Sequence, residues 1–212
     1  MASIHQGFGQ TTTYLPLGDS YTICEGLAEN ERWPNLIVDY LNKENLKITL
    51  TENPSRTGYT TNDLIKKEFP LLKTSKPDIV TLLIGVNDYV QGYDTNYFHK
   101  NLTLILNEIE KYVSVKTNII LIAIPDYSIT PQGAYYANGR DVTADLKIWN
   151  SIIEKEAKNR KIPYVDIFPT TQKMKEDESL ISSDGLHPSA KEVALWAIMI
   201  YPELKKMVKR FK

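Results

Sequence analysis

The sequence predicts an α/β fold with a central, mostly parallel five-stranded sheet covered by helices. Short apolar runs alternate along the chain with longer stretches of helical period, which is typical of a parallel sheet covered by helices. The run at residues 79–84 is almost wholly apolar, as in a strand buried on both faces. No repeat, low-complexity tract or linker divides the 212 residues. We therefore expect one domain over residues 1–212, with a flexible tail at residues 1–10.

The individual elements follow from these patterns in chain order. Strands are expected at residues 12–17, 47–51, 78–84, 118–124 and 164–167, and helices at residues 34–42, 61–72, 96–113, 142–159 and 188–208. The first helix begins with Pro34, a residue favoured in the first turn. Pro70 is expected to end or kink the second. The connection at residues 125–140 is long and rich in Tyr, Gly and Asn, which favours a functional loop.

Composition excludes several classes of function. The chain has 25 Lys and Arg residues against 26 Asp and Glu residues, so it lacks the basic excess that nucleic acid binding requires. No segment reaches the roughly 20 apolar residues that span a bilayer, and residues 1–10 lack the features of a secretory signal. We expect no stable membrane insertion and a cytoplasmic protein, or an exported form from which a signal was removed. The oligomeric state stays open.

Neither a metal nor an organic cofactor is expected. Cys24 is the single cysteine, which excludes an internal disulfide and a cysteine-based metal site. His5 and His99 have no partner at metal-ligand spacing.

Four short stretches together contain the parts of an acyl-transfer site. They are Gly-Asp-Ser at residues 18–20, Gly58, Gly-Val-Asn-Asp at residues 85–88, and Asp-Gly-Leu-His at residues 184–187. Ser20 can act as nucleophile, His187 as its base and Asp184 as the group that orients the base. The N–H groups of Ser20 and Gly58 and the amide of Asn87 can donate to an oxyanion. Three stretches follow predicted strands, so they converge where ligands bind in parallel sheets.

Each stretch also has an ordinary structural interpretation. Gly-Asp-Ser favours a turn and a helix cap, Gly58 and Asn87 suit loops, and residues 184–187 suit a surface turn. Four aspartates near strand ends are alternative acids if Asp184 is not the partner of His187. They are Asp19, Asp88, Asp126 and Asp166.

The ordered motifs resemble the four blocks of the SGNH hydrolases, also called the GDSL esterase/lipase family, from about Leu17 to the last helix. The resemblance implies a flavodoxin-like three-layer α/β/α fold and hydrolysis of esters or thioesters through an acyl-enzyme. It implies that Ser20 is the nucleophile, that Asp184 and His187 complete the triad, and that Gly58, Asn87 and the Ser20 N–H form the oxyanion hole. Tyr21 stands where the family name has leucine, which bears only on a narrower subfamily assignment.

We therefore predict a serine esterase that acts on small or moderate acyl esters, with carbohydrate acetyl esters among them. A lysophospholipase or an acyl thioesterase is the alternative, because one scaffold supports all of these activities. A carbohydrate-binding or interaction module without turnover is the alternative from another class. Labelling by a serine-reactive organophosphonate distinguishes that module from an enzyme.

Two tyrosine-rich segments, at residues 89–93 and 127–136, are expected to reach the crevice. Tyrosine offers an apolar face and a polar tip, which suits a sugar ring or another polar alcohol. The candidate substrate residues are Tyr89, Tyr93, Tyr127, Tyr135 and Tyr136. An alternative of equal weight is that these tyrosines only pack the loops.

Overall fold

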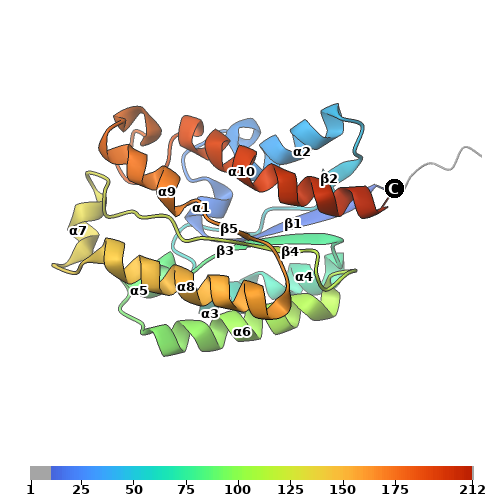
Figure 1. Ribbon diagram of the computed structural model, residues 1–212, viewed down its shortest axis with the longest axis horizontal. Helices are drawn as coiled ribbons and strands as arrows, with labels where there is room; N and C mark the ends of the chain where they lie inside the picture. The colour runs from blue at the N-terminus through green and yellow to red at the C-terminus, as the bar shows by residue number, and fades with distance from the viewer. Residues whose placement is uncertain (1–10, 212) are drawn as a thin grey trace, which may run out of the picture.

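The computed structural model describes residues 11–211 and contains one five-stranded sheet between two layers of helices (Figure 1). The strands lie in the order β2-β1-β3-β4-β5, and every neighbouring pair is parallel. They are β1 (Thr12–Gly18), β2 (Ile48–Leu50), β3 (Ile79–Leu83), β4 (Ile119–Ile122) and β5 (Tyr164–Val165). The predicted α/β class and five-stranded parallel sheet are confirmed. The tail expected at residues 1–10 lies outside the described part of the chain.

Helices cover both faces of the sheet (Figure 1). One layer contains α2 (Trp33–Lys43), α9 (Phe168–Thr171) and α10 (Ala190–Val208), and the short α1 (Ser20–Ile23) continues directly from β1. The other layer contains α3 (Thr61–Lys67), α4 (Phe69–Ser75), α5 (Val86–Val90), α6 (Thr95–Tyr112) and α8 (Val142–Arg160). The short α7 (Gly133–Ala137) lies in the connection between β4 and α8.

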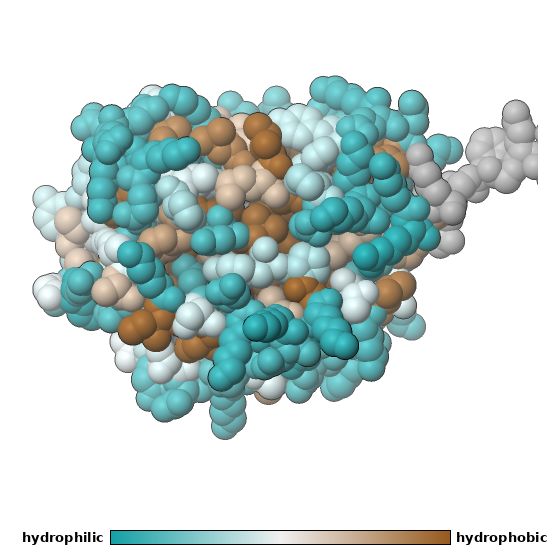
Figure 2. Space-filling view, viewed as in Figure 1, coloured by the Kyte–Doolittle hydropathy of each residue, from teal (hydrophilic) through white to brown (hydrophobic). Residues whose placement is uncertain are grey.

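The core forms because these helices are amphipathic and the central strands are apolar. Every residue of β3 and β4 is buried. On α6 the buried residues recur at helical spacing, namely Phe98, Leu102, Ile105, Leu106 and Ile109. Hydrophilic residues dominate the outer surface on the side shown in Figure 2, with small apolar patches between them. In residues 11–211 no helix combines the length and apolar character that crossing a membrane requires.

The second predicted helix is broken, as Pro70 predicts. The helix expected at residues 61–72 is two helices, α3 and α4, separated at Glu68. Pro70 occupies the first turn of α4, where its missing N–H has no intrahelical acceptor to lose. The helices α5 and α7 were not expected, because five residues are too few to show helical periodicity.

Candidate active site

The turn between β1 and α1 presents Ser20 at the carboxyl edge of the sheet. Gly18 ends the strand, and a Cβ atom there would lie 2.2 Å from the carbonyl oxygen of Leu83, so only glycine fits. The Asp19 carboxylate caps α1 by accepting the Tyr21 N–H at 3.0 Å. Within residues 11–211, neither the N–H nor the hydroxyl of Ser20 has a hydrogen-bond partner. Both groups are therefore available to a substrate.

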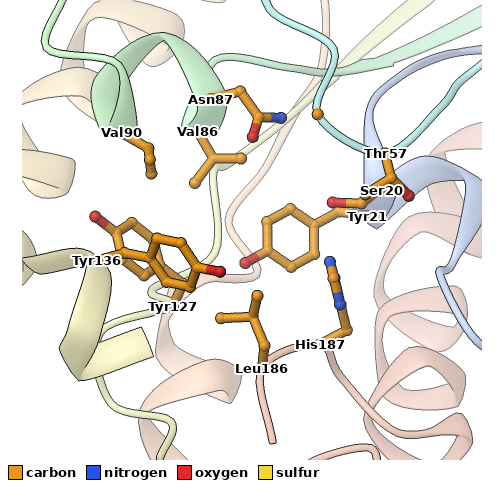
Figure 3. Close-up of a pocket in the computed structure, with 11 residues that line it drawn as sticks. Ser20, Tyr21, Thr57, Val86, Asn87, Val90, Tyr127, Tyr136, Leu186 and His187 are labelled. Carbon is orange, nitrogen blue, oxygen red and sulfur yellow. The ribbon is translucent and has the colours of Figure 1, made fainter. Parts of the chain in front are cut away.

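The turn before α10 holds His187 against Asp184. Nδ1 of His187 lies 2.6 Å from Oδ2 of Asp184, while Oδ1 accepts the N–H of His187 at 2.9 Å and the hydroxyl of Ser182 at 2.6 Å. Burial by itself would raise the pKa of Asp184, but the hydrogen bonds from Ser182 and His187 hold it far below its usual range. The ionised carboxylate accepts the Nδ1–H, so Nε2 is the atom that can take a proton. In Figure 3 the imidazole lies beside Ser20 with a nitrogen turned toward it.

Three N–H donors converge near Ser20. Gly58 has φ of 82°, which glycine adopts readily, and its N–H has no acceptor among the residues the structure describes. One amide hydrogen of Asn87 binds the Tyr59 carbonyl at 2.9 Å, which ties α5 to the Gly58 turn and leaves the second hydrogen free. Figure 3 shows the amide nitrogen of Asn87 directed toward the Ser20 side of the pocket. With the Ser20 N–H, these groups can serve a single oxyanion.

These residues line one pocket with a volume of about 180 Å³. Its walls come from widely separated parts of the chain: Ser20, Tyr21, Thr57, Gly58, Val86, Asn87, Val90, Tyr127, Tyr136, Leu186 and His187. The pocket thus brings together four of the five predicted motif residues. Asp184, the fifth, stands behind His187.

Only two of the five candidate tyrosines line the pocket. Tyr127 and Tyr136 line the pocket, whereas Tyr89, Tyr93 and Tyr135 do not. Tyr89 is buried, and its hydroxyl donates to Asp145 at 2.6 Å. Tyr93 stacks on the ring of Tyr97 at a centroid distance of 4.3 Å, and Tyr135 is 77% exposed. Tyr89 on α5 therefore contacts α8, and Tyr93 contacts α6, while neither lines the pocket.

None of the four alternative acids forms a hydrogen bond with the His187 ring. Each accepts a backbone N–H elsewhere: Asp19 accepts the Tyr21 N–H, Asp88 the Thr61 N–H at the start of α3, Asp126 the Ser128 N–H and Asp166 the Phe168 N–H. Of the five aspartates, only Asp184 lies within hydrogen-bond distance of the imidazole.

Sequence reasoning did not single out five pocket residues, although one of them, Val90, lies in the segment at residues 89–93 that was expected to reach the crevice; the five are Tyr21, Thr57, Val86, Val90 and Leu186. The sequence could have indicated these residues, because all but Val90 are adjacent to a motif residue. Val90 lies one helical turn after Val86. In the part of the chain that the structure covers, no cluster of three or more His, Cys, Asp or Glu residues is arranged to hold a metal ion.

Comparison with known proteins identifies the family. The sequence model of the GDSL-like lipase/acylhydrolase family matches residues 17–192. The chain belongs to this family. It is an ester hydrolase, and the predicted relationship to the GDSL esterases is confirmed.

Several characterised relatives resemble this GDSL-like hydrolase along most of their length. An arylesterase of Vibrio mimicus is 24% identical over 195 residues, covering 91% of this chain and 88% of the relative. Thioesterase 1/protease 1/lysophospholipase L1 of Escherichia coli K12 is 25% identical over 177 residues, covering 84% and 76%. The crystal structure of Axe2, an acetylxylan esterase of Geobacillus stearothermophilus, has the same fold, with a TM-score of 0.72, 22% identity, and coverage of 92% and 95%.

Two buried carboxyl groups adjoin the turn that presents Ser20 in this GDSL-like hydrolase. Glu68, on the break between α3 and α4, accepts the Gly18 N–H at 3.1 Å, and Asp19 is the next residue along the chain. One oxygen of each carboxyl, Oε1 of Glu68 and Oδ2 of Asp19, is buried and has no hydrogen-bond partner among residues 11–211. Burial, assisted by the nearby Asp88, raises the pKa of Asp19 to about 8, and burial raises the pKa of Glu68 well above its usual value. Asp19 is therefore largely protonated in the folded protein at neutral pH.

The raised pKa predicts that Asp19 makes stability fall as pH rises. Between about pH 4 and pH 8 the folded state holds a proton that the unfolded chain has released, so raising the pH favours unfolding. The contribution is at most about 1.4 kcal/mol per pH unit. Asp19→Asn should therefore make the slope of unfolding free energy against pH less negative, measured by urea denaturation from pH 5 to pH 7. Asp39→Asn, on the exposed face of α2, is the control. An unchanged slope in Asp19→Asn would show that Asp19 ionises normally in the folded state.

Proposed function

We propose that this ester hydrolase is a serine esterase of short acyl esters, in which Ser20, His187 and Asp184 form the catalytic triad. The observation that carries the proposal is the shared pocket: an unpaired serine hydroxyl, an imidazole bonded to a carboxylate, and three free N–H donors all meet there. Each of these groups is left without a protein partner on the side where an ester would bind.

The reaction follows from the roles these groups can take. Ser20 Oγ attacks the ester carbonyl carbon while Nε2 of His187 accepts the hydroxyl proton. The developing oxyanion accepts hydrogen bonds from the N–H groups of Ser20 and Gly58 and from the free amide hydrogen of Asn87. The imidazolium, stabilised by Asp184, then gives its proton to the leaving alcohol oxygen, and the acyl group stays on Ser20. A water molecule, deprotonated by His187, releases the acid and restores the Ser20 hydroxyl.

The size of the pocket supports short esters. An apolar cavity of roughly 150 Å³ accommodates a benzene molecule, so about 180 Å³ suits a short acyl or aryl group. Tyr127 and Tyr136 present an apolar face with a polar tip, which also suits a sugar. Acetyl esters of carbohydrates are therefore the class of natural substrate that we favour.

The chain-length dependence of hydrolysis tests this proposal. In a series of p-nitrophenyl esters from acetate to dodecanoate, we expect kcat/KM to be highest from acetate to butyrate and to fall beyond hexanoate. Tyr136→Ala, which removes a pocket wall, should raise KM more than it lowers kcat. Tyr135→Ala, its exposed neighbour outside the pocket, is the matched control.

A second candidate is a lysophospholipase or acyl thioesterase, which the similarity to the Escherichia coli enzyme favours. A rate that rises steadily to dodecanoate would contradict the short-ester proposal and favour this second function. Hydrolysis of long-chain acyl-CoA would then indicate a thioesterase, and hydrolysis of lysophosphatidylcholine a lysophospholipase.

A further inference from the structure

Tyr21, the residue after Ser20, is fixed in position and nearly buried. Its side chain is 4% exposed, and its ring packs edge-on against the rings of Trp196 and His187 at centroid distances of 6.0 and 5.8 Å. Its carbonyl oxygen accepts the indole N–H of Trp33 at 2.9 Å. The direction of its hydroxyl is therefore set by the fold and not by a flexible side chain.

The Tyr21 hydroxyl points into the candidate active site, between Val86 and Leu186 (Figure 3). Over residues 11–211 it makes no hydrogen bond. The phenol oxygen is open to the pocket, where water can accept its hydrogen bond, so a substrate oxygen that replaces this water can accept the same bond. Burial keeps the pKa of Tyr21 well above its ordinary value, so the phenol remains an O–H donor.

The surroundings make this donor selective. Val86, Val90 and Leu186 are apolar, and the amide of Asn87 and the ring of His187 serve the proposed reaction. A pure hydrocarbon placed here would displace water from the phenol and leave its O–H unpaired, which is costly. A substrate that offers an oxygen at this point avoids that cost.

We propose that Tyr21 is a specificity-determining residue whose hydroxyl donates a hydrogen bond to an oxygen substituent of the substrate. The pocket then favours esters with an ether, hydroxyl or carbonyl oxygen a few bonds from the scissile carbonyl over hydrocarbon esters of the same size. This inference rests on the proposed function, because it places the scissile ester at Ser20.

Pairs of esters that differ only by a CH₂ group replaced by oxygen test the inference. The acyl pair is p-nitrophenyl 3-methoxypropanoate and p-nitrophenyl pentanoate, and the alcohol pair is 2-methoxyethyl acetate and butyl acetate. For each pair, the ratio of kcat/KM values, ether over hydrocarbon, is measured in wild type and in Tyr21→Phe, which keeps the ring and removes the hydroxyl. Because the same two esters are compared in both proteins, their intrinsic difference in reactivity cancels.

We expect Tyr21→Phe to lower this ratio roughly 3- to 10-fold for one pair, the range of a neutral hydrogen bond. A response of the acyl pair places the oxygen in the acyl chain, and a response of the alcohol pair places it in the alcohol. Tyr40→Phe on α2, outside the pocket, should leave both ratios unchanged. Tyr21→Leu provides a second variant without the hydroxyl.

Unchanged ratios for both pairs in Tyr21→Phe and Tyr21→Leu would overturn the inference. That outcome is distinct from failure of the proposed function, which Ser20→Ala reports. If hydrolysis survives in Ser20→Ala, the assignment of the nucleophile has failed. If hydrolysis requires Ser20 while neither ratio changes, only the role of Tyr21 has failed.

Discussion

Ser20→Ala and His187→Ala should each remove almost all hydrolysis of p-nitrophenyl acetate, with losses in kcat of up to about 10⁶-fold. Without the hydroxyl, the proposed base has no proton to accept, and without the base, the hydroxyl is a poor nucleophile. The double variant should therefore be no less active than either single variant. The residual rate comes from the oxyanion donors and substrate binding, which both substitutions leave in place.

The chain offers matched controls for these substitutions. Ser55 is another buried serine, and its hydroxyl has no hydrogen-bond partner in the described part of the chain. It does not line the pocket, so Ser55→Ala should keep its activity. His99→Ala is the corresponding control for His187→Ala and should also keep its activity. Nε2 of His99 lies 2.9 Å from Glu156, outside the pocket. Losses that multiply in the double variant would show that Ser20 and His187 act independently. Covalent labelling by an organophosphonate should occur in wild type and vanish in Ser20→Ala.

Local sequence signals were sufficient to predict the sheet and to predict that the motif residues lie together at one edge of it. Apolar runs mark buried strands, and parallel strands place the segments that follow them at one edge, so Ser20, Gly58 and Asn87 converge. Pro70 likewise indicated the break between α3 and α4. These predictions needed only the order of the elements and the rule that ligands bind at the carboxyl ends of the strands.

The roles of the tyrosines could not be predicted in this way. Tyr89 lies inside because its hydroxyl reaches Asp145, 56 residues later, and its ring packs against Trp149. Tyr127 and Tyr136 line the pocket, while Tyr135, adjacent in sequence, faces solvent. The distinction depends on long-range packing and on the orientation of α7, neither of which has a local signature.

Asp184→Asn is expected to lower kcat by about 10⁴-fold while leaving the fold intact. The amide oxygen can still accept the N–H groups of Leu186 and His187, which Asp184 accepts at 2.8 and 2.9 Å. The amide nitrogen, however, would face Nδ1 and donate to it. His187 would then carry its proton on Nε2, the atom that must take the proton of Ser20.

Ser182→Ala separates this tautomer effect from general weakening of the turn. It removes the hydroxyl that donates to the same carboxylate at 2.6 Å but leaves the bond between Oδ2 and Nδ1 in place. We therefore expect a loss of kcat far smaller than that of Asp184→Asn, because the contact that fixes the tautomer of His187 is kept. Equal losses in Asp184→Asn and Ser182→Ala would mean that Asp184 only shapes the turn. If Asp184→Asn keeps its activity and Asp166→Asn loses it, Asp184 is not the acid on which His187 depends.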